Sequence, residues 1–163
     1  MDCDDDASCT PDAGGCVARK PGYVSPSVAR GAMLRHGLTG LQVAARVGVN
    51  PSTVRNWLAG RTAPTPAKLA ALAQVLELNV RDLTGVLPGR ETLSDMRVHA
   101  ALNQSETAER VGLSQSAFST IEQGAAPLSE GLCASLADIY GEPQGAVRDA
   151  WQRANDTLKG FPQ

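Results

Sequence analysis

Apolar residues recur at helical spacing along most of the chain, in short runs that glycine, proline and capping residues separate. The clearest run places Leu69, Leu72, Ala73 and Leu76 at intervals of three and four residues. An apolar stripe of this period covers one face of a helix. The pattern therefore predicts an all-α fold made of short helices.

A repeat organises these helices into two copies of one unit. The segment 44–50 (AARVGVN) returns 64 positions later as 108–114 (AERVGLS), and the alignment continues without a gap. Apolar positions keep their character, since Val54 aligns with Phe118 and Trp57 with Ile121, whereas polar positions diverge. Two tandem packing units follow.

Capping residues divide each copy into helices. The starts in the first copy are Ser25 before Pro26, Thr39 with Gln42, Asn50 before Pro51, Thr65 before Pro66, and Asn79. Those in the second copy are Asn103 with Glu106, Ser114, Ser129 and Pro143. We expect a tail over 1–24, a first five-helix domain over 25–86, a linker over 87–92, and a second over 93–163 with an extended last helix.

Composition agrees with small helical cores, because 42% of the 163 residues are hydrophobic but only 4% are aromatic. The net charge of −2 hides an uneven distribution: residues 27–86 carry +5 and residues 87–150 carry −5. A basic domain attracts phosphate, whereas an acidic one meets it at a cost. The first 24 residues include five aspartates and are expected to form an acidic disordered tail.

In each copy the second helix, a glycine-containing turn and the third helix form a helix-turn-helix pattern. The stretches 102–108 (LNQSETA), 111–116 (VGLSQS) and 121–124 (IEQG) resemble the lambda-repressor-like family of the Cro or xenobiotic-response-element type. Residues 38–39 (LT), 47–53 (VGVNPST) and 57–60 (WLAG) resemble it more loosely. The resemblance covers about residues 27–145 and implies two tandem five-helix domains.

The resemblance also implies which residues contact DNA. Base edges would be met by Pro51, Ser52, Arg55 and Asn56 in the first copy, and by Gln115, Ser116, Ser119 and Thr120 in the second. Thr53 is also expected to contact DNA. Phosphates would be met by Gly40, Arg61 and Gln104. Chemistry supports the first copy, because Arg can grip guanine and Asn adenine with two hydrogen bonds each. The plainer interpretation is that Arg55 and Asn56 are simply solvated.

Two of these positions depart from the family. Gly40 stands where the family has glutamine, and Ala125 stands in the second copy where the first has Arg61. Each copy thus keeps some of the residues that contact DNA in the family. Because the first copy is basic, it is expected to bind DNA more strongly than the second.

Family resemblance further places a structural pair, an Arg in the first helix against a Glu at the end of the recognition helix. In the second copy these positions hold Arg97 and Glu122, and in the first copy they hold Met33 and Leu58.

The function expected from these observations is a sequence-specific, double-stranded DNA-binding transcriptional regulator that acts as a repressor. The alternative is a protein-binding module of the same fold, antitoxin-like or an anti-repressor. A stripe on the last helix could form a homodimer interface or pack on its own domain: Val147, Ala150, Trp151, Ala154 and Leu158.

Enzymatic chemistry is not expected. His36 and His99 have no nucleophile or metal partner at motif spacing, no glycine-rich phosphate loop occurs, and no cofactor is implied. The cysteines form no CxxC pair, so no metal site is expected: Cys3, Cys9, Cys16 and Cys133. No apolar run reaches 18 residues and the N-terminus is acidic, which predicts a cytoplasmic protein without a membrane partner.

Overall fold

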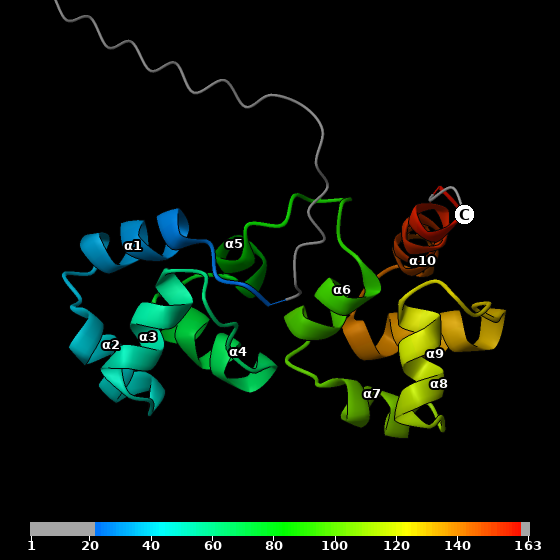
Figure 1. The fold of residues 1–163 in the computed structure, drawn as a ribbon, viewed down its shortest axis with the longest axis horizontal. Coiled ribbons are helices and arrows are strands. Elements are labelled where there is room, and N and C mark those ends of the chain that lie inside the picture. The colour runs from blue at the N-terminus through cyan, green and yellow to red at the C-terminus, as the bar shows by residue number, and fades with distance from the viewer. Residues whose placement is uncertain (1–21, 161–163) are drawn as a thin grey trace, which may run out of the picture.

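The structure is a computed structural model that describes residues 22–160. Over that range the chain forms ten α-helices and no strand, arranged as two groups of five (Figure 1). The first group is α1 (Pro26–Arg35), α2 (Gly40–Val47), α3 (Pro51–Leu58), α4 (Pro66–Val75) and α5 (Val80–Thr84). The second group is α6 (Leu93–His99), α7 (Gln104–Arg110), α8 (Gln115–Glu122), α9 (Glu130–Tyr140) and α10 (Gln144–Lys159). The all-α fold of two five-helix units is confirmed.

Helix starts coincide with the capping residues. Thr39 and Asn103 form reciprocal capping boxes with the residues three positions on, and Ser114 accepts a hydrogen bond from the Ala117 amide. Asn50 occupies the N-cap position of α3, but its side chain makes no capping hydrogen bond. A further box, between Thr92 and Asp95 at the start of α6, was not predicted. These local contacts explain why short segments hold helical shape.

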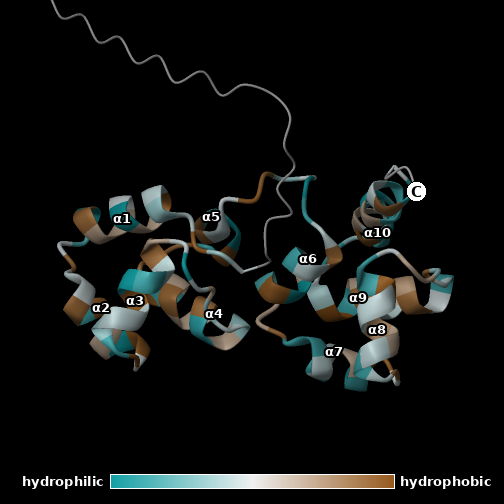
Figure 2. Ribbon diagram, viewed as in Figure 1, coloured by the Kyte–Doolittle hydropathy of each residue, from teal (hydrophilic) through white to brown (hydrophobic). Residues whose placement is uncertain are grey.

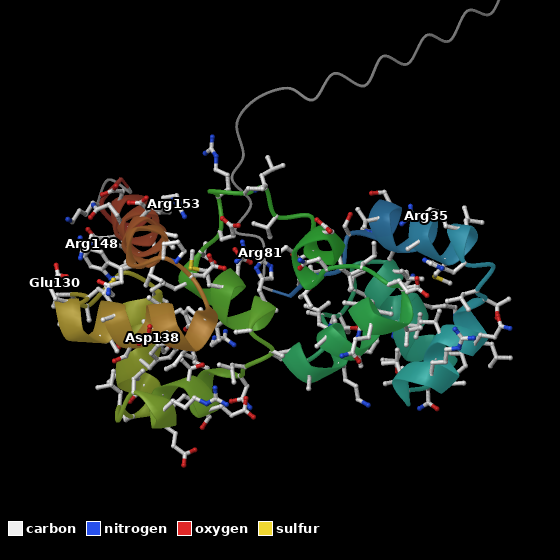
Figure 3. All side chains as sticks on the ribbon, turned by 180° about the vertical axis from the view of Figure 1, so that it is seen from behind. Arg35, Arg81, Glu130, Asp138, Arg148 and Arg153 are labelled. Carbon is white, nitrogen blue, oxygen red and sulfur yellow. The ribbon has the colours of Figure 1, made fainter. Side chains whose placement is uncertain are left out.

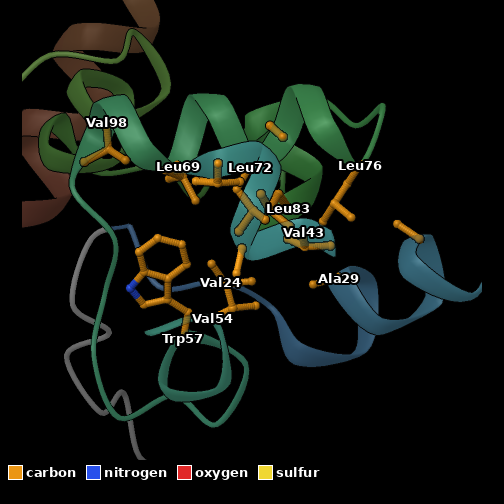
Figure 4. Packing of buried hydrophobic residues seen from close by; sticks show 14 residues of the cluster. Val24, Ala29, Val43, Val54, Trp57, Leu69, Leu72, Leu76, Leu83 and Val98 are labelled. Atoms are coloured by element: carbon orange, nitrogen blue, oxygen red, sulfur yellow. The ribbon is translucent and has the colours of Figure 1, made fainter. Parts of the chain in front are cut away.

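Each group of helices encloses its own core, and the helices turn their apolar faces inward (Figure 2). The first core gathers residues from α2, α3, α4 and α5 around Leu69 and Leu72 (Figure 4). The second core surrounds Phe118, which is fully buried, and includes Leu136 and Val147. Aliphatic side chains therefore make up most of both cores, and the aromatic members are Trp57 in the first and Phe118 and Tyr140 in the second.

The N-terminal boundary of the first domain differs from the expectation. Val24 was assigned to the tail over 1–24, but it is only 2% exposed and belongs to the first core. The next residue, Ser25, donates its backbone amide to Leu83 O at 2.8 Å. This hydrogen bond joins the extended segment before α1 to α5. Packing therefore begins before residue 25. The rest of the expected acidic tail, with Cys3, Cys9 and Cys16, lies outside the described residues.

None of the helices between residues 22 and 160 combines the length and the apolar character that crossing a membrane requires.

Candidate nucleic-acid interface

In the first copy, α2 and α3 are joined by a tight turn at Gly48. Gly48 has φ +71°, a left-handed conformation that a residue without Cβ adopts at low cost. Lys68 of α4 reaches this turn and donates from Nζ to Val47 O at 3.0 Å and to Gly48 O at 3.3 Å. The carbonyls that the end of α2 leaves free are thereby satisfied. A side chain from the domain body thus fixes the angle between the two helices.

The outward face of α3 carries the residues that the resemblance assigns to base contacts. Its inward face is buried through Val54 and Trp57, which anchor the helix to the first core. The predicted DNA-contacting residues are exposed or half-buried: Pro51, Ser52 and Arg55 are exposed, and Thr53 and Asn56 are half-buried. The helix therefore presents a polar face to a partner, while its opposite face is packed on the first core.

Positive charge is freely available on the first copy. Five of its arginines are exposed and make no ion pair with any carboxylate between residues 22 and 160: Arg30, Arg35, Arg46, Arg55 and Arg61. Its two other cations are engaged, since Lys68 caps the turn and Arg81 binds carboxylates outside the copy. Unpaired arginines suit phosphate oxygens.

The second copy carries a chain of polar contacts that runs from its first helix to the start of its recognition helix. Arg97 Nε of α6 donates to Glu122 Oε1 at 2.7 Å, and Gln104 Nε2 of α7 donates to Glu122 Oε2 at 2.8 Å. Gln115 Nε2, at the start of α8, lies 3.5 Å from Gln104 Oε1. Arg97 also donates to Leu102 O at 3.0 Å. The outermost side chain, Gln115, is thus oriented by a partly buried ion pair.

Tyr140 of α9 lies beside this ion pair. Burial, and next the negative charge of Glu122, raise the pKa of its hydroxyl, so that the side chain stays neutral. No sequence pattern predicted a tyrosine at this place.

The first copy has a different residue at each of the four positions that make these polar contacts. At the aligned positions it has Met33, Leu58, Gly40 and Pro51. Met33 and Leu58 are half-buried and pack against the first core. Because neither a lone charge nor a lone amide remains, the exchange leaves no buried group without a partner. The two copies hold their recognition helices by different means, one by polar contacts and one by packing.

The hydroxyl groups of α8 are partly occupied within the helix. Thr120 Oγ1 donates to Ser116 O at 2.7 Å, and Ser119 Oγ accepts from Gln123 Nε2 at 3.1 Å. Ser116 Oγ lies 3.2 Å from Ser114 Oγ. Each oxygen keeps at least one lone pair that can accept a hydrogen bond from a ligand.

The turns after the two recognition helices differ in a way that the alignment did not reveal. The turn after α3 is open, and Arg61 on it is exposed. The turn after α8 is covered by α10: Trp151 Nε1 donates to Ala126 O at 3.0 Å and Asn155 Nδ2 donates to Gly124 O at 2.7 Å. The only sequence signal was the greater length of the last helix. This turn is thus bound to its own domain.

The apolar stripe of α10 is used by the same packing. Val147 and Ala150 are fully buried in the second core, Trp151 and Ala154 are half-buried, and Leu158 is 48% exposed. Of the two uses that were considered, packing on its own domain accounts for most of the stripe. A homodimer interface on this helix stays a prediction, and Leu158 is the most exposed residue of the stripe.

Comparison with protein families gives two matches, one for each copy. A family model described as "Helix-turn-helix" matches residues 30–83, and one described as "Helix-turn-helix domain" matches residues 90–151. No curated protein and no solved structure matches the chain significantly. Domains of this kind are found in DNA-binding regulators.

Proposed function

The chain carries two tandem helix-turn-helix domains that match the lambda-repressor-like family, and from this we propose that it is a sequence-specific transcriptional regulator that binds double-stranded DNA and represses. One observation carries the proposal. In both copies the second helix of the pair is anchored by buried apolar residues and turns polar side chains outward. A helix held in this way can enter the major groove and meet base edges.

In the first copy, α3 supplies two side chains suited to direct readout. The Arg55 guanidinium can donate to guanine O6 and N7, and the Asn56 amide can pair with adenine N6 and N7. Pro51 has no donor and would contact a thymine methyl group, while Ser52 and Thr53 would add single hydrogen bonds. Exposed arginines around this helix supply the attraction to phosphate that such a complex needs.

Phosphate contacts are proposed at both ends of the helix pair. Gly40 lies at the start of α2, where free backbone amides suit a phosphate oxygen. Arg61 lies on the open turn after α3. In the second copy Gln104 occupies the start of α7 and contacts the base-reading Gln115. The same glutamine can therefore link a phosphate contact to base readout by Gln115, with Ser116, Ser119 and Thr120 completing that surface.

A protein-binding role has two observations in its favour, and both concern the second copy alone. That copy is acidic overall, and α10 covers the turn that would otherwise approach a phosphate. A fold does not by itself fix a function.

Selection of bound sites from random double-stranded DNA with the full chain tests the proposal. We expect a defined motif, and an affinity for it that falls steeply as salt rises from 50 to 200 mM. A shuffled version of the selected site serves as the control. Absence of an enriched motif, or binding that salt does not weaken, would overturn the proposal in favour of the protein-binding role.

A further inference from the structure

The two helix-turn-helix copies share an interface whose apolar part is centred on Val98. Val98 belongs to α6 of the second copy, yet it is 4% exposed and is a member of the first core (Figure 4). It lies beside Leu69 of α4, and α4 and α6 are in contact. The entry segment lies close to this contact, because a Cβ placed on Gly22 would lie 3.5 Å from Val98 Cγ1. One side chain thus crosses from one copy into the core of the other.

Arg81 provides the ionic part of the same interface. It lies on α5 of the first copy, at the junction between the two copies (Figure 3). Its guanidinium pairs with Glu91, which precedes α6, at 3.3 Å and with Glu142, which precedes α10. Both carboxylate side chains are largely buried, at 7% and 15% exposed. One first-copy cation therefore pairs with two carboxylates, one from the linker and one from the second copy.

Glu91 is also held through its backbone, since Arg153 Nη2 of α10 donates to Glu91 O at 2.5 Å. The residue was expected in a linker that merely tethers the domains. Instead it contacts a helix of each copy, which explains why Glu91 is buried while residues 87–90 of the same connection are exposed.

A hydrogen bond completes the interface. Thr84 Oγ1 of α5 lies 3.0 Å from His99 Nε2 of α6 and donates to Arg81 O at 2.9 Å. A hydroxyl has one proton, so the His99 Nε2–H must be the donor to Thr84. Apolar, ionic and hydrogen-bonding contacts thus meet within a small region, and rotation of one copy against the other would break all three.

Both helix pairs that would read DNA lie on the same long side of the molecule. The pairs α2–α3 and α7–α8 occupy its lower side in the view of Figure 1 and again from behind in Figure 3. The ionic contacts of Arg81 lie away from that side. Part of the acidic charge of the second copy is therefore paired with Arg81 at the interface. That part does not repel the DNA phosphates that α8 would approach.

From these contacts we infer that the two copies form one rigid reading unit, which recognises a bipartite DNA site whose half-sites have a single fixed spacing. The inference rests on the proposed function and adds the form of the site to it. Half-sites rotate around the duplex by one turn in about 10.5 base pairs, so a rigid reader tolerates few changes of spacing. A flexible tether would tolerate many, because a mobile linker samples a range of separations.

The experiment measures the affinity of the full chain for its selected site and for versions with two, five and ten base pairs inserted between the half-sites. Arg81→Ala and Glu142→Ala each remove one partner of the interface ion pair, and they change the net charge in opposite directions. Arg90→Ala is the matched control, because Arg90 is exposed on the same connection and makes no ion pair with a described residue. Circular dichroism confirms that each variant remains helical.

We expect every insertion to weaken binding by the unaltered chain at least about tenfold, towards the affinity of a single half-site. Arg90→Ala should keep this spacing dependence, and both Arg81→Ala and Glu142→Ala should reduce it to about threefold or less. Binding to one half-site only, or equal affinity at all spacings, would overturn the inference while leaving the proposed function intact. Failure to bind any DNA would overturn both.

Discussion

Arg97 and Glu122 form an ion pair with 2.7 Å between Arg97 Nε and Glu122 Oε1, and their side chains are only 11% and 4% exposed. The pair ties α6 to the end of the recognition helix α8. A buried charge that loses its partner stays desolvated without compensation, whereas replacing both charges by apolar groups removes the problem. The first copy shows the second solution, with Met33 and Leu58 at the same positions.

A double-mutant cycle on this pair should therefore be strongly non-additive. We expect Glu122→Leu alone to lower the free energy of unfolding by about 3 to 5 kcal/mol, and the addition of Arg97→Met to recover much of that loss. Recovery should stay incomplete, because Gln104 also loses its acceptor on Glu122. Denaturant unfolding of the full chain measures the cycle. Purely additive losses would mean that the two side chains do not interact in solution.

The converse change in the first copy provides the control. Leu58→Glu should destabilise the protein, because a carboxylate would enter a half-buried position and the residue aligned with Arg97 is Met33, which cannot pair with it. The double variant Met33→Arg with Leu58→Glu should regain part of the loss.

The interactions that the sequence could predict are those encoded by short spacing or by the repeat. A capping box such as Thr39 with Gln42 spans three residues, so its two partners are visible in any window of the sequence. The Arg97–Glu122 pair spans 25 residues, and the family resemblance indicated it.

The interface between the copies could not be predicted in this way. Arg81 contacts Glu142, which is far away in sequence. The sequence pattern within the first copy does not distinguish Arg81 from an arginine that stays exposed. Val98 likewise fits the apolar pattern of α6 whichever core it enters. Tertiary placement decides both, and the linker therefore looked like a simple tether.

Arg55 and Arg61 should contribute to DNA binding in distinguishable ways. Arg55→Ala is expected to cost about 1 to 3 kcal/mol on the selected site and to relax the preference at one base position, because it removes a bidentate base contact. Asn56→Ala should do the same at a neighbouring position. Site selection repeated with each variant measures this, and an unchanged motif with Arg55→Ala would contradict direct readout.

Arg61→Ala is the matched comparison, since Arg61 is also an exposed arginine of the same copy. If Arg61 contacts a phosphate, its loss should weaken binding to all DNA sequences similarly. The slope of log affinity against log salt concentration should fall by about the value of one phosphate contact. A base-specific effect there would assign Arg61 to readout.

Lys68 should stabilise the first helix-turn-helix pair through the carbonyls of the turn. Lys68→Met keeps the aliphatic stem but removes the two hydrogen bonds to Val47 O and Gly48 O. Hydrogen bonds from a charged donor contribute roughly 1.5 to 3 kcal/mol, so we expect a loss of about that size in unfolding free energy. Arg46→Met, which removes an exposed cation from the same copy, should change stability by less than about 0.5 kcal/mol. Equal effects of the two substitutions would show that charge, and not the capping of the turn, is responsible.

Gly124 and Gly60 occupy aligned positions with similar backbone conformations, φ +78° and +66°, but different surroundings. A Cβ at Gly60 would meet nothing within 4 Å, whereas one at Gly124 would lie 2.8 Å from Asn155 Cα on the backbone of α10. Gly60→Ala should therefore cost only the strain of a left-handed residue, about 1 to 2 kcal/mol. Gly124→Ala carries the same strain and must also push α10 away, which adds about 1 to 3 kcal/mol and weakens the Asn155 and Trp151 hydrogen bonds to the turn. Thermal unfolding gives the stability difference, and the fluorescence of Trp151, measured in a Trp57→Phe background, reports whether α10 has moved. If the two substitutions cost the same and the emission of Trp151 does not shift, α10 does not pack against this turn in solution.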